Sequence, residues 1–307
     1  MDVSSFLVQS LNSVQYGFLL FLVASGLTLI FGILGVINLA HGSFFMIGAY
    51  LAHWLALKTG NLFVAIALAL PLSFLLGLAV ERLAIGFLYA RDHLYQVLLT
   101  YGLILIFNEL QRILWGNDVH GVPVPELLSA SIPLTEAQSY PLYRFFISLA
   151  CIGVAAAMYL VIHRTKLGML IRAGAANRVM VGALGVNITL LYTLVFALGA
   201  LLAGLAGLMA APIYGVEIGM GDGVLIKTFV VIVIGGIGSI RGAFLAAILI
   251  GVVDTLGRGF LPVVLGDLLD PQAAQTVAPA LGSMLIYLLM AVVLAFRPQG
   301  LFPVARR

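Results

Sequence analysis

Charge is scarce in this 307-residue sequence. Asp, Glu, Lys and Arg together make up only 9% of the residues, whereas 63% are apolar, and the mean hydropathy is +1.17. A soluble globular domain carries about 25% charged residues. A chain with so little charge cannot cover a surface that faces water, so we expect an all-α, multi-pass membrane protein in contact with lipid.

Other features that are scarce or missing exclude further classes of protein. The single cysteine, Cys151, cannot form an intrachain disulfide and is expected to be a small buried hydrophobe. The net charge of +3 is too small and too scattered to indicate a nucleic-acid partner. Walker-type motifs, paired intramembrane carboxylates and clustered histidines are all missing, so we expect no enzyme and no cofactor or metal in this chain. The first residues lack the basic region and cleavage site of a signal peptide, so the first apolar run should be retained.

Long apolar runs dominate what is present, and a helix needs about 20 such residues to cross the hydrocarbon. Nine runs are candidates: 8–36, 43–57, 62–80, 95–115, 143–162, 188–211, 223–238, 242–257 and 280–296. Four of them are short or interrupted: 43–57, 143–162, 223–238 and 242–257. We therefore expect a single domain, 1–307, that forms a polytopic helical bundle of eight or nine segments, not all of them full crossings.

The connections between these runs segregate by charge. Most basic residues lie in 81–93, in 163–187 and at the C-terminus, which carries Arg306 and Arg307, whereas 116–141 and 213–222 lean acidic. The positive-inside rule places the basic connections and the C-terminus in the cytoplasm, and the N-terminus is expected on the periplasmic side. The outer, proline-rich connection 116–141 is either a docking surface for an outside partner or a simple connector.

Two apolar segments are broken by glycine and polar residues, at GVINLAHGS (35–43) and at GGIGSIRG (235–242). Because broken membrane helices at matching positions point to a transport site, we treat them as counterparts in a repeat with halves near 8–115 and 188–297. Irregular backbone at membrane depth must be buried in protein or line a wet cavity. We predict that seven residues line one translocation pathway: Asn38, His41, Ser43, Gly235, Gly236, Gly238 and Ser239.

Individual polar residues leave alternatives open. His41 is either a pathway residue or a partner for freed backbone carbonyls. Lys227, four residues into a predicted span, is expected to extend to the outer interface, although a functional role stays open. Asp254 and Arg258, four apart, are expected to form an interfacial pair. The pathway itself should be largely apolar, with few fixed charges.

The segment HRTKLGMLIRAGAANRVMVGALGVN (163–187) is the one long cytoplasmic connection. Its small and apolar residues favour one or two short helices that end at a glycine. Such helices have no core of their own, so we expect them to dock in a groove of a partner protein, or else to lie on the membrane surface.

Three stretches now carry a resemblance: GLTLIFGILGVINLAHGSFFMIGAY (26–50), RAGAANRVMVGALGVN (172–187) and KTFVVIVIGGIGSIRGAFLAAILIG (227–251). Together they resemble the permease subunits of bacterial ABC importers for branched-chain amino acids, the LivH type. The resemblance implies an inner-membrane complex with a second homologous permease subunit, two cytoplasmic ATPase subunits that hold ATP and Mg, and a periplasmic solute-binding protein. It also implies that eight residues serve ATPase coupling: Arg172, Gly174, Ala175, Ala176, Asn177, Ala183, Leu184 and Gly185.

The solute is the least determined part of the resemblance. Permeases of this type also occur with urea, amides and aromatic acids. In the coupling segment, the run from Gly174 to Asn177 lacks the acidic residue that relatives often carry there, which bears on polar contacts with the ATPase and not on the solute. A secondary transporter is a further alternative, for which His41 is the one attractive ion-coupling residue. A membrane-embedded enzyme is disfavoured, since no catalytic set of residues lies within the spans.

Overall fold

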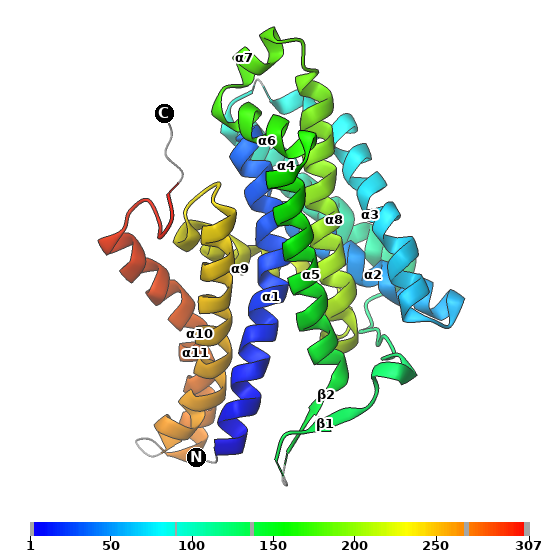
Figure 1. The fold of residues 1–307 in the computed structure, drawn as a ribbon. Coiled ribbons are helices and arrows are strands. Elements are labelled where there is room, and N and C mark those ends of the chain that lie inside the picture. Colours follow the sequence, from blue (N-terminus) through cyan, green and yellow to red (C-terminus); the bar gives the residue numbers. More distant parts are fainter. Residues whose placement is uncertain (1–2, 90, 136–137, 267–269, 304–307) are drawn as a thin grey trace.

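The computed structural model describes residues 3–89, 91–135, 138–266 and 270–303, which form an all-α bundle with one small hairpin (Figure 1). Its helices are α1 (Val3–Leu34), α2 (His41–Thr59), α3 (Leu62–Leu83), α4 (His93–Trp115), α5 (Leu142–Arg164), α6 (Lys166–Ala176), α7 (Arg178–Ala183), α8 (Ile188–Tyr214), α9 (Met220–Gly235), α10 (Ile240–Gly266) and α11 (Pro271–Phe296). Two short 3-10 helices, η1 (Ile85–Leu88) and η2 (Glu126–Leu128), and two strands, β1 (Ser131–Pro133) and β2 (Ser139–Pro141), complete it.

Seven helices in the described part of the chain are long and apolar enough to cross a membrane: α1, α3, α4, α5, α8, α10 and α11. The expected multi-pass architecture is therefore confirmed. The helices α2 and α9, with 19 and 16 residues, fall outside this group. The prediction that 143–162 and 242–257 are short or interrupted is wrong, because α5 and α10 are continuous helices of 23 and 27 residues.

The helices α1 and α8 form the core of the bundle. Their most apolar 18-residue stretches are 83% buried, against 17–28% in the other five crossing helices. The helix α1 packs mainly on α10 and α8, whereas α8 packs on α2 and α3. Glycines at the contacts bring these backbones close together, since a Cβ on Gly199 would lie 2.6 Å from the Ile30 side chain. Lipid supplies no hydrophobic force between helices, so close packing of this kind holds them together.

The two sides of the bundle differ. Figure 1 shows the N-terminal end of α1 and the β1–β2 hairpin on one side, and α6, α7 and the segment that follows α11, up to residue 303, on the other. The hairpin pairs antiparallel, with Ile132 opposite Tyr140, and no long helix forms in the described part of 116–141. Arg306 and Arg307 lie outside the described residues.

Candidate functional site

The first break enters the interior of the bundle. Residues 35–40 are not helical, and α2 begins at His41, whose Nε2 donates a hydrogen bond to the Val23 carbonyl (3.0 Å). Val23 lies eleven residues before the end of α1, or about 16 Å along the helix axis. Asn38, His41 and Ser43 are all buried, with at most 2% of each residue exposed. His41 thus binds a backbone carbonyl, which is one of the two roles expected for this residue.

The second break lies elsewhere along α1. Its turn, between the end of α9 and the start of α10, contains Gly236 and Gly238, both with positive φ, and Gly238 packs against Gly32, in the last turn of α1. The neighbouring Gly235 carbonyl accepts from the Phe302 amide (3.0 Å), and Oγ of Ser239 accepts from the Gly242 amide (3.1 Å). Gly32 and Val23 are nine residues apart, about 13 Å along the helix. The two breaks therefore contact different levels of α1, and a pathway role for the seven predicted residues stays a prediction.

A different connection meets the first break. Residues 215–219, predicted as part of an acidic outer loop, lead from α8 into α9, which begins at Met220. There Gly221 packs so closely on Gly42 that a Cβ on Gly221 would lie 2.7 Å from the Gly42 carbonyl carbon. Two helices, α2 and α9, thus begin side by side within the bundle. Neither helix has a side-chain N-cap, so the first backbone N–H groups of each helix need acceptors from nearby backbone or solvent.

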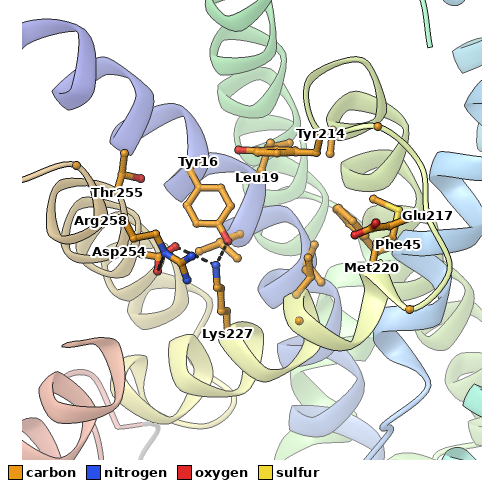
Figure 2. Close-up of a pocket in the computed structure, with 18 of the residues that line it drawn as sticks. Tyr16, Leu19, Phe45, Tyr214, Glu217, Met220, Lys227, Asp254, Thr255 and Arg258 are labelled. Atoms are coloured by element: carbon orange, nitrogen blue, oxygen red, sulfur yellow. Dashed lines mark hydrogen bonds and ion pairs between the residues drawn. The ribbon is translucent and has the colours of Figure 1, made fainter. Parts of the chain in front are cut away.

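A cavity of about 670 Å³ lies next to this junction, between α1, α2, α8, α9 and α10 (Figure 2). Its lining extends along α1 from Gln9 to Val23, about 21 Å of helix. None of the seven residues predicted for the pathway is among those that line it. The sequence interpretation therefore missed this cavity beside the broken segments.

One side of the cavity carries a charged cluster, which we define as Tyr16, Lys227, Asp254 and Arg258 (Figure 2). Nζ of Lys227 lies 2.9 Å from Oδ2 of Asp254 and 2.7 Å from the Tyr16 hydroxyl oxygen. Nε of Arg258 lies 2.9 Å from Oδ1 of Asp254. The side chain of Asp254 is only 6% exposed, so both ion pairs are partly shielded from water.

The other walls of the cavity are largely apolar. Leu19 and Val23 of α1, Phe45 of α2 and Met220 of α9 contribute to them. Figure 2 shows Glu217, an exposed carboxylate, beside Phe45 and Met220 and well apart from Lys227. The cavity can therefore hold a small solute that has an ionised group at one end and an apolar body.

This cluster corrects one expectation and confirms another. Lys227 does not extend to the interface, because Asp254 and Tyr16 hold its ammonium group within the protein. The pair Asp254–Arg258, expected from their spacing of four, is present, but Asp254 is buried in the bundle, whereas an interfacial pair was expected. The signal that could have identified the site is an ionisable residue in each of two neighbouring spans, since such residues face partners or water rather than lipid.

The segment expected to dock ATPases forms two short helices, α6 and α7, as predicted. Asn177 separates them and caps α7, its Oδ1 accepting from the Met180 amide (3.0 Å), and Gly185 with φ +86° ends the segment. Val179, Met180 and Leu184 are 76%, 59% and 77% exposed. The surface of α7 is thus apolar and uncovered in the described chain.

The eight predicted coupling residues divide into two groups. Arg172 donates to the Ile162 carbonyl, and Gly174 is buried against Leu191, so both anchor α6 to its neighbours α5 and α8. The remaining six residues are exposed: Ala175, Ala176, Asn177, Ala183, Leu184 and Gly185. A partner could reach this second group without disturbing the bundle.

A buried carboxylate lies on the same side of the bundle as α6 and α7. Glu81 is 1% exposed and accepts a hydrogen bond from the Tyr89 hydroxyl (2.7 Å), while Nε of Arg82 lies 3.8 Å from its second oxygen. Burial, the hydrogen bond to Glu81 and the charge of Glu81 all raise the pKa of Tyr89 above its usual value. Tyr89 therefore stays neutral and supplies the donor that this carboxylate needs.

Comparison with known proteins identifies the family. Residues 10–294 match the family described as "Branched-chain amino acid transport system / permease component". The chain is 30% identical to the high-affinity branched-chain amino acid transport system permease protein BraD of Pseudomonas aeruginosa, over 98% of this chain and 96% of that protein. It is 28% identical to the corresponding permease protein LivH of Escherichia coli K12, over 83% and 87%, and 25% identical to LivM of the same organism, over 92% and 67%.

No solved structure matches this chain at a significant level. The match to the family nevertheless covers nearly the whole chain and includes both breaks, the segment of α6 and α7, and every residue of the charged cluster. Taken with the seven crossing helices, this places the chain in the family of branched-chain amino acid transport permease components.

Proposed function

We propose that this protein is a permease subunit of an ATP-driven ABC importer that moves branched-chain or related amino acids from the periplasm to the cytoplasm. The observation that carries the proposal is the full-length similarity to permeases named for branched-chain amino acid transport, at 28–30% identity. The apolar cavity with a charged cluster supports it, because such a solute has a charged head and an apolar side chain.

The proposed complex contains a second, homologous permease subunit. Similarity to both LivH and LivM, which are named as separate permease proteins of E. coli, supports a heterodimer of related subunits. Two cytoplasmic ATPase subunits would bind ATP and Mg, and a periplasmic solute-binding protein would deliver the amino acid. No cofactor is assigned to this chain.

The ATPases would dock on the exposed part of α6 and α7. Val179, Met180 and Leu184 offer an apolar surface that a groove in a partner can bury. This assignment puts α6, α7 and the C-terminal end in the cytoplasm and the N-terminal end and the β1–β2 hairpin in the periplasm of an inner-membrane protein. The basic connections then lie inside, as the positive-inside rule expects.

Reconstitution tests the proposed function. The chain is expressed with its neighbouring subunits, purified as a complex and inserted into proteoliposomes, and uptake of radiolabelled leucine, isoleucine and valine is measured with and without ATP inside. We expect ATP-dependent uptake of all three that needs the binding protein. Uptake of urea, an amide or an aromatic acid in their place would reject the solute, and uptake driven by a proton gradient with this chain alone would reject the mechanism.

A further inference from the structure

The charged cluster has hydrogen-bond donors to spare. Asp254 uses both carboxylate oxygens, one for Lys227 and one for Arg258. A lysine ammonium has three N–H donors and an arginine has five. Among the described residues, the ammonium of Lys227 donates to Asp254 and Tyr16, and the guanidinium of Arg258 donates through Nε alone. One Lys227 proton, four Arg258 protons and the Tyr16 hydroxyl proton therefore have no acceptor within the described chain.

The cluster also carries an excess positive charge. Two cations share one anion, which leaves a net charge of +1 where the side chains of Asp254, Lys227 and Arg258 are 6%, 20% and 47% exposed. Water screens the ammonium of Lys227 poorly and the half-exposed guanidinium of Arg258 more strongly. An anionic group that enters the cavity therefore gains both a charge partner and several donors that are not yet used.

A carboxylate is a small anion that fits this arrangement. Its two oxygens can accept one N–H from Lys227 and another from the guanidinium of Arg258 in parallel. Leu19, Val23, Phe45 and Met220 form the apolar wall of the same cavity, with Phe45 and Met220 on the side away from Lys227 (Figure 2), and would cover the apolar side chain of the same molecule. Glu217 lines the same cavity but lies well apart from Lys227, and it forms no ion pair with the cluster in the described chain (Figure 2).

We propose that Lys227 and Arg258 form a subsite for the α-carboxylate of a transported amino acid, with its apolar side chain against the wall of α1, α2 and α9. Asp254 positions the two cations, and Tyr16 holds the ammonium of Lys227 over its ring, 4.9 Å from the ring centroid. The choice of an amino acid as the ligand rests on the proposed function. The requirement for a carboxylate rests on the cluster alone.

Three ligands that differ only in the head group test the subsite on the unaltered complex in lipid nanodiscs, without the binding protein. They are leucine, its keto acid 4-methyl-2-oxopentanoate, which keeps the carboxylate, and 3-methylbutylamine, which lacks it. Each competes with radiolabelled leucine in an equilibrium binding assay. We expect leucine and the keto acid to compete, and the amine to compete at least about tenfold more weakly, a difference of about 1.4 kcal/mol.

Variants locate the effect. Lys227→Gln should weaken leucine binding at least about tenfold, and Lys227→Arg should stay within about threefold of the unaltered protein. Lys58→Gln is the matched control, since it removes the same charge from an exposed residue near the end of α2, outside the cavity. Lys227→Gln should weaken the binding of 3-methylbutylamine far less than the binding of leucine, because the amine has no carboxylate.

The outcomes separate this proposal from the proposed function. The subsite is wrong if the amine competes as well as leucine, if leucine does not bind at millimolar concentration, or if Lys227→Gln binds leucine normally. It is also wrong if Lys227→Gln weakens the binding of leucine and of 3-methylbutylamine equally, because the ion pair would then serve only the fold. Each of these results can occur while the reconstituted importer still moves leucine, so the subsite can fail alone.

Discussion

The contact between Gly42 and Gly221 permits a sharp test of the packing at the start of α2 and α9. A Cβ on Gly42 would lie 2.9 Å from both the carbonyl carbon of Gly221 and Cβ of Leu225. A Cβ on Gly221 would lie 2.7 Å from the carbonyl carbon of Gly42 and 3.2 Å from the Ser43 amide nitrogen. Alanine at either position therefore meets backbone, which cannot rotate away as a side chain can.

The magnitude follows from the distances. Carbon atoms in contact prefer about 3.5–4.0 Å, so alanine requires the two helices to separate by about 0.6–1 Å. Overpacking of this kind costs about 1–3 kcal/mol. For a large domain each kcal/mol lowers the melting temperature by about 2–4 °C, so each variant should melt at least about 2 °C below the unaltered protein. Uptake should fall as well, because the separation opens the wall of the cavity at Met220.

The assay compares Gly42→Ala and Gly221→Ala with Gly153→Ala in detergent, by thermal unfolding and by leucine uptake of the reconstituted complex. Gly153, in the middle of α5, has open space where a Cβ would stand, with no neighbouring atom of the described chain within 4 Å, so alanine there should lower neither quantity. Normal melting and normal uptake in both test variants would refute the close contact between the two helix starts.

Three further predictions follow from single residues. Ala183→Pro should break α7 at a cost of about 3 kcal/mol, and should abolish both uptake and solute-stimulated ATP hydrolysis of the complex; unchanged values of both would reject docking at α7. The folded-state pKa of Tyr89 is raised, so its contribution to stability is complete below about pH 10 and is lost as the pH rises further. Between about pH 9 and about pH 11, the melting temperature of Tyr89→Phe should therefore fall less steeply than that of the unaltered protein. Equal slopes for the two proteins would contradict this. Cys151 is 1% exposed, so a maleimide should label it rapidly only after denaturation, and fast labelling of the native protein would contradict its burial.

The helix starts that the sequence could predict are those with local signals. The predicted runs 62–80 and 188–211 begin at the first residues of α3 and α8, directly after Asn61 and Asn187. Both asparagine side chains accept hydrogen bonds from backbone amides in the first turn, which fixes the start of the helix within a few residues of sequence. The apolar composition of the runs predicted the spans themselves, since lipid tolerates little else.

The predicted end of α10 was wrong for an electrostatic reason. The predicted run 242–257 stops among Asp254 and Arg258, since charges normally end a span. In the structure Asp254 pairs with both Arg258 and Lys227 inside the bundle, so the helix continues to Gly266. Hydropathy treats each charge alone, whereas the cost of burying it depends on its partners.

The charged cluster could not be assembled from sequence alone. Tyr16 and Lys227 are 211 residues apart, and their contact depends on how α1 packs beside α9 and α10. Each residue taken singly has an ordinary explanation, a tyrosine within a span or a lysine that extends to the interface. Only the packing brings the three charges to one side of one cavity.

The order of helices explains why 215–219, rather than 235–242, meets the first break. A long buried helix, a break and a shorter helix occur twice, as α1 with α2 and as α8 with α9, and Figure 1 shows α1 and α8 running in opposite directions. The contacts of the two long helices correspond in the same way, because α1 packs on α10 in one half and α8 packs on α3 in the other. The halves 8–115 and 188–297 stay a prediction, but these contacts support an inverted repeat in which the shorter helices correspond.

The length of α9 alone would have favoured aligning α9 with α2. With 16 residues α9 is about 24 Å long, too short for hydrocarbon about 30 Å thick, so the chain must enter the membrane before or after the helix. Its far end, at Gly235, is tied to the C-terminal segment through Phe302, which leaves the start at Met220 to lie inside. The acidic residue Glu217, which made 213–222 look like an outer loop, is tolerated there because it borders a cavity rather than lipid. A short helix next to a glycine-rich connection therefore indicates an inward loop even when that connection carries charge.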